Sequence, residues 1–122
     1  MVYYRSATQR VWEGPVPGVY RLQHDDDEYQ WTLSTAAGQI LLTSARHKSE
    51  GDAVATIAAA RICSVLPDRY ERWESNSGYY FILKAANGAV LATSETYASR
   101  AAKNAGIRTC MLVGPVAPTV RV

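Results

Sequence analysis

Tyr29 to Ala60 reads YQWTLSTAAGQILLTSARHKSEGDAVATIAAA, and 50 residues later Tyr79 to Cys110 reads YYFILKAANGAVLATSETYASRAAKNAGIRTC. Ten of the 32 aligned pairs are identical without a gap, where typical residue frequencies would give roughly two. The identical pairs include Leu33/Leu83, Gly38/Gly88, Thr43/Thr93, Ser44/Ser94, Ser49/Ser99 and Ile57/Ile107. This pattern predicts a duplicated unit.

The 122 residues fit one domain with a modest core. Units of this size are too small to be stable separately, so we expect them to share that core. The predicted organisation is a single domain, 1–122, with an N-terminal extension at 1–18, a first repeat at 19–68 and a second repeat at 69–122.

Each unit is expected to contain three strands followed by a helix. Large apolar residues alternate with polar ones around Trp31 and Leu33, and Phe81 and Leu83 repeat the large apolar positions in the second unit. This period of two is typical of a strand with one face in the core. Asn87-Gly88 predicts a tight hairpin turn, because both residues tolerate positive φ.

The two helices are predicted to begin after Ser49 and Ser99, whose side chains can cap the first turn. In the first helix, apolar residues follow at helical spacing: Val54, Ile57, Ala58, Ile62 and Val65. Cys63 is expected on the side of the helix opposite that stripe. Cys63 and Cys110 are not equivalent in the repeat, so we expect two free thiols and no disulfide.

The periodicity continues beyond the second helix, since Val120 stands 50 residues after Tyr70 and Tyr70 stands 50 after Tyr20. This predicts a terminal strand over Thr119 to Val122. The fold class expected from these elements is α+β: two tandem β3-α repeats that form one antiparallel sheet, with both helices on one face.

The segment from Phe81 to Gly88, followed by Ser94 to Ser99 and by Gly106-Ile107, resembles the YegP-like family of small tandem-repeat proteins. The family pattern is an apolar strand, Lys-Ala-x-Asn-Gly, a short strand, Ser-Glu-x-Tyr-x-Ser and a later Gly-Ile. The second unit matches nearly every position, whereas the first is degenerate and has Ala45 and His47 in place of the Glu and the Tyr.

The resemblance covers Val19 to the C-terminus and implies tandem β3-α units in one sheet, with the C-terminal strands of the repeats exchanged. It implies no activity, because the family has no established biochemical function.

A polar group in the second unit combines residue types used in acid-base catalysis: Lys84, Asn87, Ser94, Glu95, Tyr97 and Ser99. Each of them also has a structural interpretation, which we favour. Asn87 would form the turn, Ser99 would cap the helix, Ser94 would bond the backbone, and Glu95 would pair with Lys84 across the sheet.

A second candidate surface lies on the sheet face away from the helices. If Phe81 and Leu83 face the core, Tyr80, Ile82 and Lys84 point outward as an apolar-aromatic strip that ends in a charge. Such a strip could bind a protein or stack nucleic-acid bases. The alternative is that the N-terminal extension covers it, with Tyr3, Tyr4 and Trp12 lying on the body of the protein.

The composition and the charge of the chain argue against some classes of binding partner. The net charge of +2 gives no support to nucleic-acid binding. No apolar run is long enough to span a membrane, so we expect a cytoplasmic protein. The acidic run at His24 to Glu28 is interpreted as a solvated turn and not a metal site, and Arg46-His47-Lys48 as a solvated edge and not a phosphate site. We expect no cofactor and no metal.

Three functions follow, and no residue cluster decides among them. The first is a small non-catalytic interaction module that binds a protein partner through the open sheet face or a strand edge. The second is a nucleic-acid-binding protein that uses the same face. The third is an enzyme with its site near Lys84, Glu95 and Tyr97. The tentative binding residues are Tyr80, Ile82, Lys84, Asn87, Glu95 and Tyr97, and we expect a monomer (an internal pseudo-dimer) or a weak homodimer.

Overall fold

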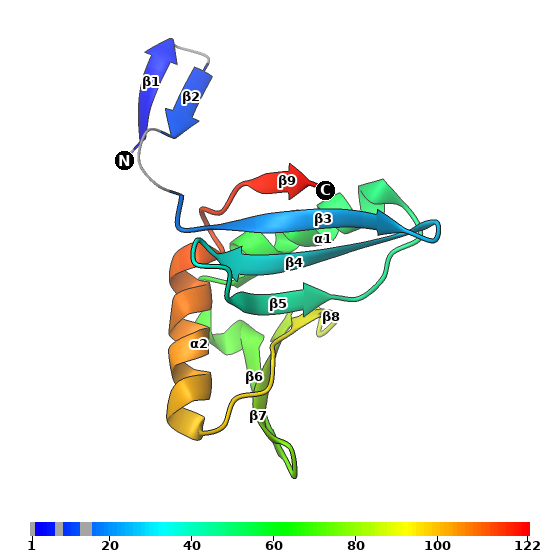
Figure 1. Cartoon of the computed structure of the whole chain (residues 1–122), viewed down its shortest axis with the longest axis vertical. Coiled ribbons are helices and arrows are strands. Elements are labelled where there is room, and N and C mark those ends of the chain that lie inside the picture. The colour runs from blue at the N-terminus through cyan, green and yellow to red at the C-terminus, as the bar shows by residue number, and fades with distance from the viewer. Residues whose placement is uncertain (1, 7–8, 13–15) are drawn as a thin grey trace.

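The computed structural model describes the backbone of residues 2–6, 9–12 and 16–122, and the side chains from residue 16 onward. In chain order the elements are β1 (Val2–Ser6), β2 (Gln9–Trp12), β3 (Gly18–Asp25), β4 (Glu28–Thr35), β5 (Ile40–Ser44), α1 (Glu50–Cys63), a short 3₁₀ helix (Pro67–Arg69), β6 (Tyr70–Ser75), β7 (Gly78–Lys84), β8 (Val90–Thr93), α2 (Arg100–Val113) and β9 (Thr119–Arg121) (Figure 1).

Strands β3 to β9 form one seven-stranded sheet in the order β6-β7-β8-β5-β4-β3-β9. The two halves join where β5 pairs antiparallel with β8, and there Thr43 lies opposite Thr93, its equivalent 50 residues later. β1 and β2 pair antiparallel as a separate two-stranded sheet. The expected packing of Tyr3, Tyr4 and Trp12 on the body lies outside the described side chains.

The terminal strand forms as predicted, but its direction corrects the expectation of a wholly antiparallel sheet. β9 pairs parallel with β3, and Thr119 lies beside Tyr20. The reason is where α2 ends. Gly18, at the start of β3, lies so near Val113 that an added Cβ would come within 2.6 Å of its Cγ1. A chain that leaves the helix at that point runs along β3 in the direction of β3.

Within the described residues, only one of the two strand exchanges that the family resemblance implies is present. β9 follows α2 and joins β3 of the other half. β6 follows α1, but it pairs antiparallel with β7 as the first strand of its own hairpin. No other strand of the described residues pairs with the outer side of β6, so β6 is an edge strand of the sheet.

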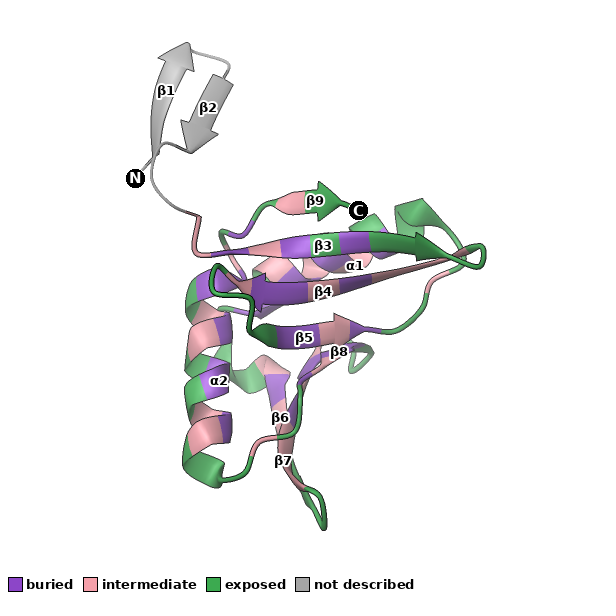
Figure 2. Ribbon diagram, in the orientation of Figure 1, coloured by how far each residue is buried: buried purple, intermediate pink, exposed green. Residues whose placement is uncertain are grey.

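Both helices cover the sheet face that carries the core, as expected. Trp31 on β4 is fully buried, and its Nε1 donates to Thr56 Oγ1 on α1 at 2.8 Å. Phe81, 50 residues later on β7, is also fully buried and lies against Gly106 on α2. Figure 2 shows the burial concentrated in the middle of the sheet and on the inner sides of the helices.

The serines that recur in the repeat have the structural roles predicted for them. Ser49 Oγ accepts from the amide of Asp52 and caps α1, and Ser99 does the same for α2. The amide of Phe81 donates to Ser94 Oγ at 2.9 Å. These bonds satisfy backbone groups that would otherwise lack partners.

The buried side of α1 differs from the predicted one. Its buried residues are Ala53, Ile57, Ala60 and Cys63, whereas Val54, Ile62 and Val65 are exposed. The cause is the sheet beneath, because Tyr20 and Trp31 already fill the space there and small residues let the helix approach closely. Cys63 therefore lies on the buried side. Both cysteines are free thiols, as predicted, and both are buried.

Candidate functional site

The outer face of the β6-β7 hairpin carries the most distinctive surface of the described residues. Trp73 on β6 lies directly opposite Tyr80 on β7. Their rings stack with centroids 6.3 Å apart and planes 10° from parallel, yet 45% of the Trp73 surface stays exposed. Ile82, two residues beyond Tyr80, is half-buried on the same face. We call Trp73, Tyr80 and Ile82 the aromatic strip.

An ion pair closes one end of the aromatic strip. Lys84 Nζ lies 3.5 Å from Glu71 Oε2, and Trp73 Nε1 donates to the other carboxylate oxygen, Oε1, at 3.0 Å. The expectation that Lys84 pairs with Glu95 is therefore wrong. The reason is strand order, because β6 is the neighbour of β7 and presents Glu71 diagonally to Lys84.

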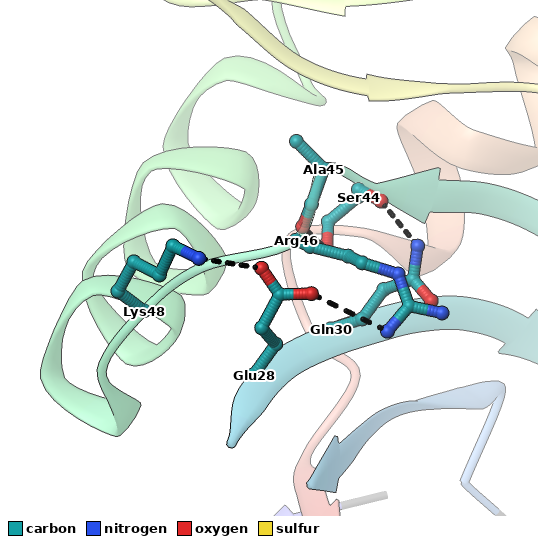
Figure 3. A network of polar contacts seen from close by, with 6 residues as sticks. All are labelled: Glu28, Gln30, Ser44, Ala45, Arg46 and Lys48. Atoms are coloured by element: carbon teal, nitrogen blue, oxygen red, sulfur yellow. Dashed lines mark hydrogen bonds and ion pairs between the residues drawn. The ribbon is translucent and has the colours of Figure 1, made fainter. Parts of the chain in front are cut away.

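The first half places polar residues at the same positions. The residues 50 positions before Trp73, Tyr80 and Ile82 are Gln23, Gln30 and Thr32. Gln30 Nε2 donates to the carbonyl oxygen of Ser44 at 2.9 Å, as Figure 3 shows. The same sheet position thus accepts a hydrogen-bonded amide in one half and a tyrosine ring in the other.

The edge beside Gln30 is a network of charges (Figure 3). Glu28 lies between two cations, with Lys48 Nζ at 3.1 Å and Arg46 Nη1 at 3.8 Å. Arg46 and Lys48 therefore both pair with the carboxylate of Glu28. This arrangement supports the interpretation of the segment as a solvated edge and not as a phosphate site. The equivalent positions in the second half are Gly78, Thr96 and Ala98, which carry no charge.

The remaining predicted site residues do not join the aromatic strip. Asn87 Oδ1 accepts from the amide of Ala89 at 2.9 Å and forms the turn, as its structural interpretation predicts. Glu95 is exposed beyond the end of β8. Tyr97 lies on the helix side of the sheet and stacks on the buried Phe81, with ring centroids 6.1 Å apart. Lys84 and Tyr97 thus lie on opposite faces of the sheet, so Lys84, Glu95 and Tyr97 do not form one site.

Tyr97 has an unusual environment. Its hydroxyl is buried against Gly106 and has no hydrogen-bond partner among the described residues. Burial raises the pKa of this hydroxyl above its ordinary value. In the first half the equivalent His47 Nε2 lies 3.1 Å from Thr56 Oγ1, the same atom that accepts from Trp31. A polar chain in one half thus corresponds to an aromatic stack in the other.

The acidic run forms the β3-β4 turn. Asp26 and Asp27 have positive φ, at 50° and 62°, as a two-residue hairpin turn requires. Within the part of the chain that the structure describes, no group of three His, Cys, Asp or Glu side chains is arranged to hold a metal ion. No helix among the described residues is long and apolar enough to cross a membrane.

Sequence reasoning missed Trp73, the most exposed member of the strip. A signal was present, because Tyr70 faces the core and residues three apart on a strand point to opposite faces. A strand that continues from Tyr70 through Trp73 therefore places Trp73 on the outer face. A strand edge was among the predicted binding surfaces, but the sequence did not identify β6 as an edge strand, because that depends on the order of the strands in the sheet.

The chain is similar to several known proteins. A domain of unknown function, DUF1508, matches residues 74–120. A UPF0339 protein of Pseudomonas aeruginosa is 34% identical over 93 residues, which cover 75% of this chain and 84% of that protein. One from Acinetobacter baylyi is 40% identical over 86 residues, which cover 70% of this chain and 78% of that protein.

Two solved structures have the same fold. The solution NMR structure of YegP from Escherichia coli matches with a TM-score of 0.82 and 28% identity, and covers 88% of this chain and 95% of that one. The solution NMR structure of a UPF0339 protein from Shewanella oneidensis matches with a TM-score of 0.81 and 28% identity, over 87% and 92% of the two chains.

The seven-stranded sheet, the two helices and the matched segment 74–120 together define a mixed α+β protein of the YegP type. The chain belongs to the UPF0339 family, of which YegP is a member. The family is uncharacterised, so membership supplies the fold and no activity.

Proposed function

We propose that this protein is a small non-catalytic module that binds an extended polypeptide of a partner protein on the aromatic strip and along the free edge of β6. The observation that carries the proposal is the difference between the halves. The outer face of one half has Gln23, Gln30 and Thr32, and that of the other has the aromatic strip.

The fold does not need aromatic residues at these positions. Because the first half builds the same pair of strands with polar residues, folding alone does not account for a half-exposed tryptophan in the second. Exposed tryptophan and tyrosine side chains are the residue types that dominate binding energy at protein interfaces. We infer that the halves are diverged copies and that the second acquired the binding surface.

The free edge beside the strip favours an extended ligand. β6 ends the sheet, so the backbone groups on its outer side are available to another strand. Every second side chain of an added strand would point to the outer sheet face, where Trp73 lies. Glu71 and Lys84 at one end of the strip offer one charge of each sign to polar groups of the ligand.

The repeat supplies the matched variant for the experiment. Trp73→Gln, Tyr80→Gln and Ile82→Thr together give the second half the outer face that the first half already has. A displayed library of random peptides, each about 10 residues long as a strand is, would be selected against the full chain. Peptides that bind the wild type and lose at least about tenfold in affinity for the triple variant support the proposal.

The same variant distinguishes the other functions. Tight binding of a single-stranded oligonucleotide that weakens steeply with salt and is lost in the triple variant would favour the nucleic-acid function instead. Selected peptides that bind wild type and triple variant equally would contradict a role for the aromatic strip. A matched control is Gln30→Ala in the first half, which should leave peptide binding unchanged.

A further inference from the structure

The edge of β6 that faces away from β7 corresponds, in the first half, to an edge that this chain itself pairs. β3 is the equivalent of β6, and β9 lies along its outer edge as a parallel strand. The amide of Val122 donates to the carbonyl oxygen of Leu22 at 3.0 Å at the end of this pairing. The equivalent of Leu22 on β6 is Arg72. The first half therefore shows how a strand can lie on the β6 edge.

The backbone of β6 presents hydrogen-bonding groups on this edge from Tyr70 onward. The amide of Phe81, which lies opposite Arg72, donates to Ser94 Oγ on the far side of β7. Opposite residues of an antiparallel pair either bond each other or both point away, so Arg72 directs its amide and carbonyl to the free edge. The amide of Tyr70 donates to the carbonyl oxygen of Pro67. An added strand would therefore begin its pairing at the Tyr70 carbonyl.

The side chains of β9 that point toward the helix layer show which helix positions such a strand contacts. Thr119 Oγ1 accepts from Arg61 Nη2 at 2.6 Å, and Arg121 Nε donates to Glu50 Oε2 at 3.0 Å. Arg61 and Glu50 both belong to α1. Val120, between the two contact residues, points to the outer sheet face. A strand at this edge is thus read by α1 at two positions, two residues apart.

The first of these helix positions is apolar in the second half. Met111 on α2 is the equivalent of Arg61. In the first half the segment before β9 covers Arg61, since Ala117 is buried and its carbonyl oxygen accepts from Arg61 Nε at 3.1 Å. In the second half the surface beside Met111 is open, as a shallow hollow of about 260 Å³ lined by Arg108, Met111 and Leu112. This position therefore favours an apolar side chain of the ligand.

The second helix position has the opposite charge, because Arg100 on α2 is the equivalent of Glu50. α2 runs beside β6 here, since Arg100 Nε donates to Glu74 Oε1 at 2.6 Å and Arg72 Nε donates to Asn104 Oδ1 at 3.4 Å. A guanidinium group has five N–H donors, so Arg100 can bind a second carboxylate beside Glu74. α2 contains no acidic residue that would repel one.

We propose that the partner segment binds parallel to β6, as β9 binds to β3, and carries an apolar residue followed two positions later by an acidic one. The apolar side chain fills the hollow beside Met111. The carboxylate pairs with Arg100, which exchanges the charges of the Arg121–Glu50 pair. The residue between them points to the outer face, toward the aromatic strip. This binding mode rests on the proposed function and adds to it the direction and the side chains of the ligand.

Peptides of about 10 residues selected on the wild type should share this apolar-x-acidic pattern. Met111→Arg gives α2 the residue that α1 already has, and it should lower their affinity at least about tenfold, because the apolar side chain would then meet a charge. Arg100→Glu should lower it at least about fivefold, and exchanging the peptide's acidic residue for arginine should restore most of the loss.

The matched control is Lys48→Glu, which makes the same change of charge in the first half, where Lys48 is 86% exposed. It should leave peptide binding unchanged. Circular dichroism checks folding, and Arg100→Gln and Met111→Gln replace any variant that does not fold. A nitroxide label at the N-terminus of the peptide measures direction. In a parallel strand it should broaden the amide signals at Tyr70 more than those at Ser75.

The outcomes separate this binding mode from the proposed function. Stronger broadening at Ser75 means an antiparallel ligand and overturns the binding mode. So do peptides that lose affinity for the triple variant of the aromatic strip but bind Met111→Arg and Arg100→Glu as tightly as the wild type. Both results leave the proposed function in place. Failure to select any peptide that depends on the aromatic strip contradicts the proposed function and this binding mode with it.

Discussion

The hydroxyl of Tyr20 donates to the carbonyl oxygen of Gly114 at 2.8 Å and so joins the first strand of one half to the helix end of the other. The equivalent Tyr70 donates to the carbonyl oxygen of Ser64 at 2.6 Å and joins the first strand of the second half to the helix end of the first. Both hydroxyls are buried and both bonds satisfy a carbonyl at the end of a helix. Each half thus completes the helix of the other.

Removing either hydroxyl should destabilise the whole fold. Tyr20→Phe and Tyr70→Phe leave a buried carbonyl without its donor, so each should lower the free energy of unfolding by about 1 to 3 kcal/mol. Urea denaturation measures this. Tyr80→Phe is the control, because Tyr80 lies on the outer sheet face, and it should change stability by less than about 0.5 kcal/mol. Equal effects of all three changes would contradict the role of the cross-half bonds.

Gly106 should be a helical glycine that does not tolerate alanine. An added Cβ would lie 2.7 Å from Cζ of Tyr97 and 3.3 Å from Cε2 of Phe81, so Gly106→Ala should cost about 1 to 3 kcal/mol. Gly51→Ala is the control, since the nearest atom to its Cβ is Ser49 Oγ at 3.9 Å. There alanine should add up to about 1 kcal/mol.

The first half indicates how the loss at Gly106 can be recovered. Its equivalent of Gly106 is Thr56, and its equivalent of Tyr97 is the smaller His47. Tyr97→His should therefore restore part of the stability lost in Gly106→Ala. Thermal denaturation of the single and double variants checks this, and a double variant that is no more stable than Gly106→Ala alone would contradict it.

The strands were predictable from the sequence because their signals are local. Alternation around Trp31 and Phe81, the Asn87-Gly88 turn and the serine caps each depend on a few neighbouring residues. The buried side of α1 was not predictable, because Val54, Ile62 and Val65 compete with Ala53 and Ala60 for the core, and the shape of the sheet decides. The partner of Lys84 and the direction of β9 depend on contacts distant in sequence.

Stability should fall in alkaline solution. Burial raises the pKa of the Cys110 thiol from 9.0 to about 12, and burial also raises the pKa values of Tyr20 and Tyr70. The folded state keeps these protons while the unfolded chain releases them. The stabilisation is complete below about pH 9 and is lost as the pH rises toward 12, at about 1.4 kcal/mol per pH unit for each group between its two pKa values.

Urea denaturation at about pH 8 and about pH 10.5 measures this dependence. Cys110→Ala should be less stable at the lower pH but should lose less stability between the two, because it has no thiol to titrate. An identical loss in the variant and the wild type would exclude Cys110 as a cause.

Neighbouring residues on β7 should differ sharply in their tolerance to change. Phe81 is fully buried, so Phe81→Ala should cost about 3 to 5 kcal/mol. Tyr80→Ala loses only the stacking on Trp73 and partial burial, about 1 kcal/mol. Denaturation midpoints compare them. If Tyr80→Ala proved as damaging as Phe81→Ala, the outer face would be covered and the aromatic strip would not be a free surface.

Peptide binding on the aromatic strip is tested most directly by NMR shift mapping with a peptide selected on the wild type. The indole N–H of Trp73 and the backbone amides of β6 should shift on titration, because the peptide extends the sheet there. The amides of β9, at the other sheet edge, should not. Shifts confined to β9 or to the exposed apolar residues Ile62 and Leu112 at the helix ends, with Trp73 and β6 unchanged, would contradict the proposed site.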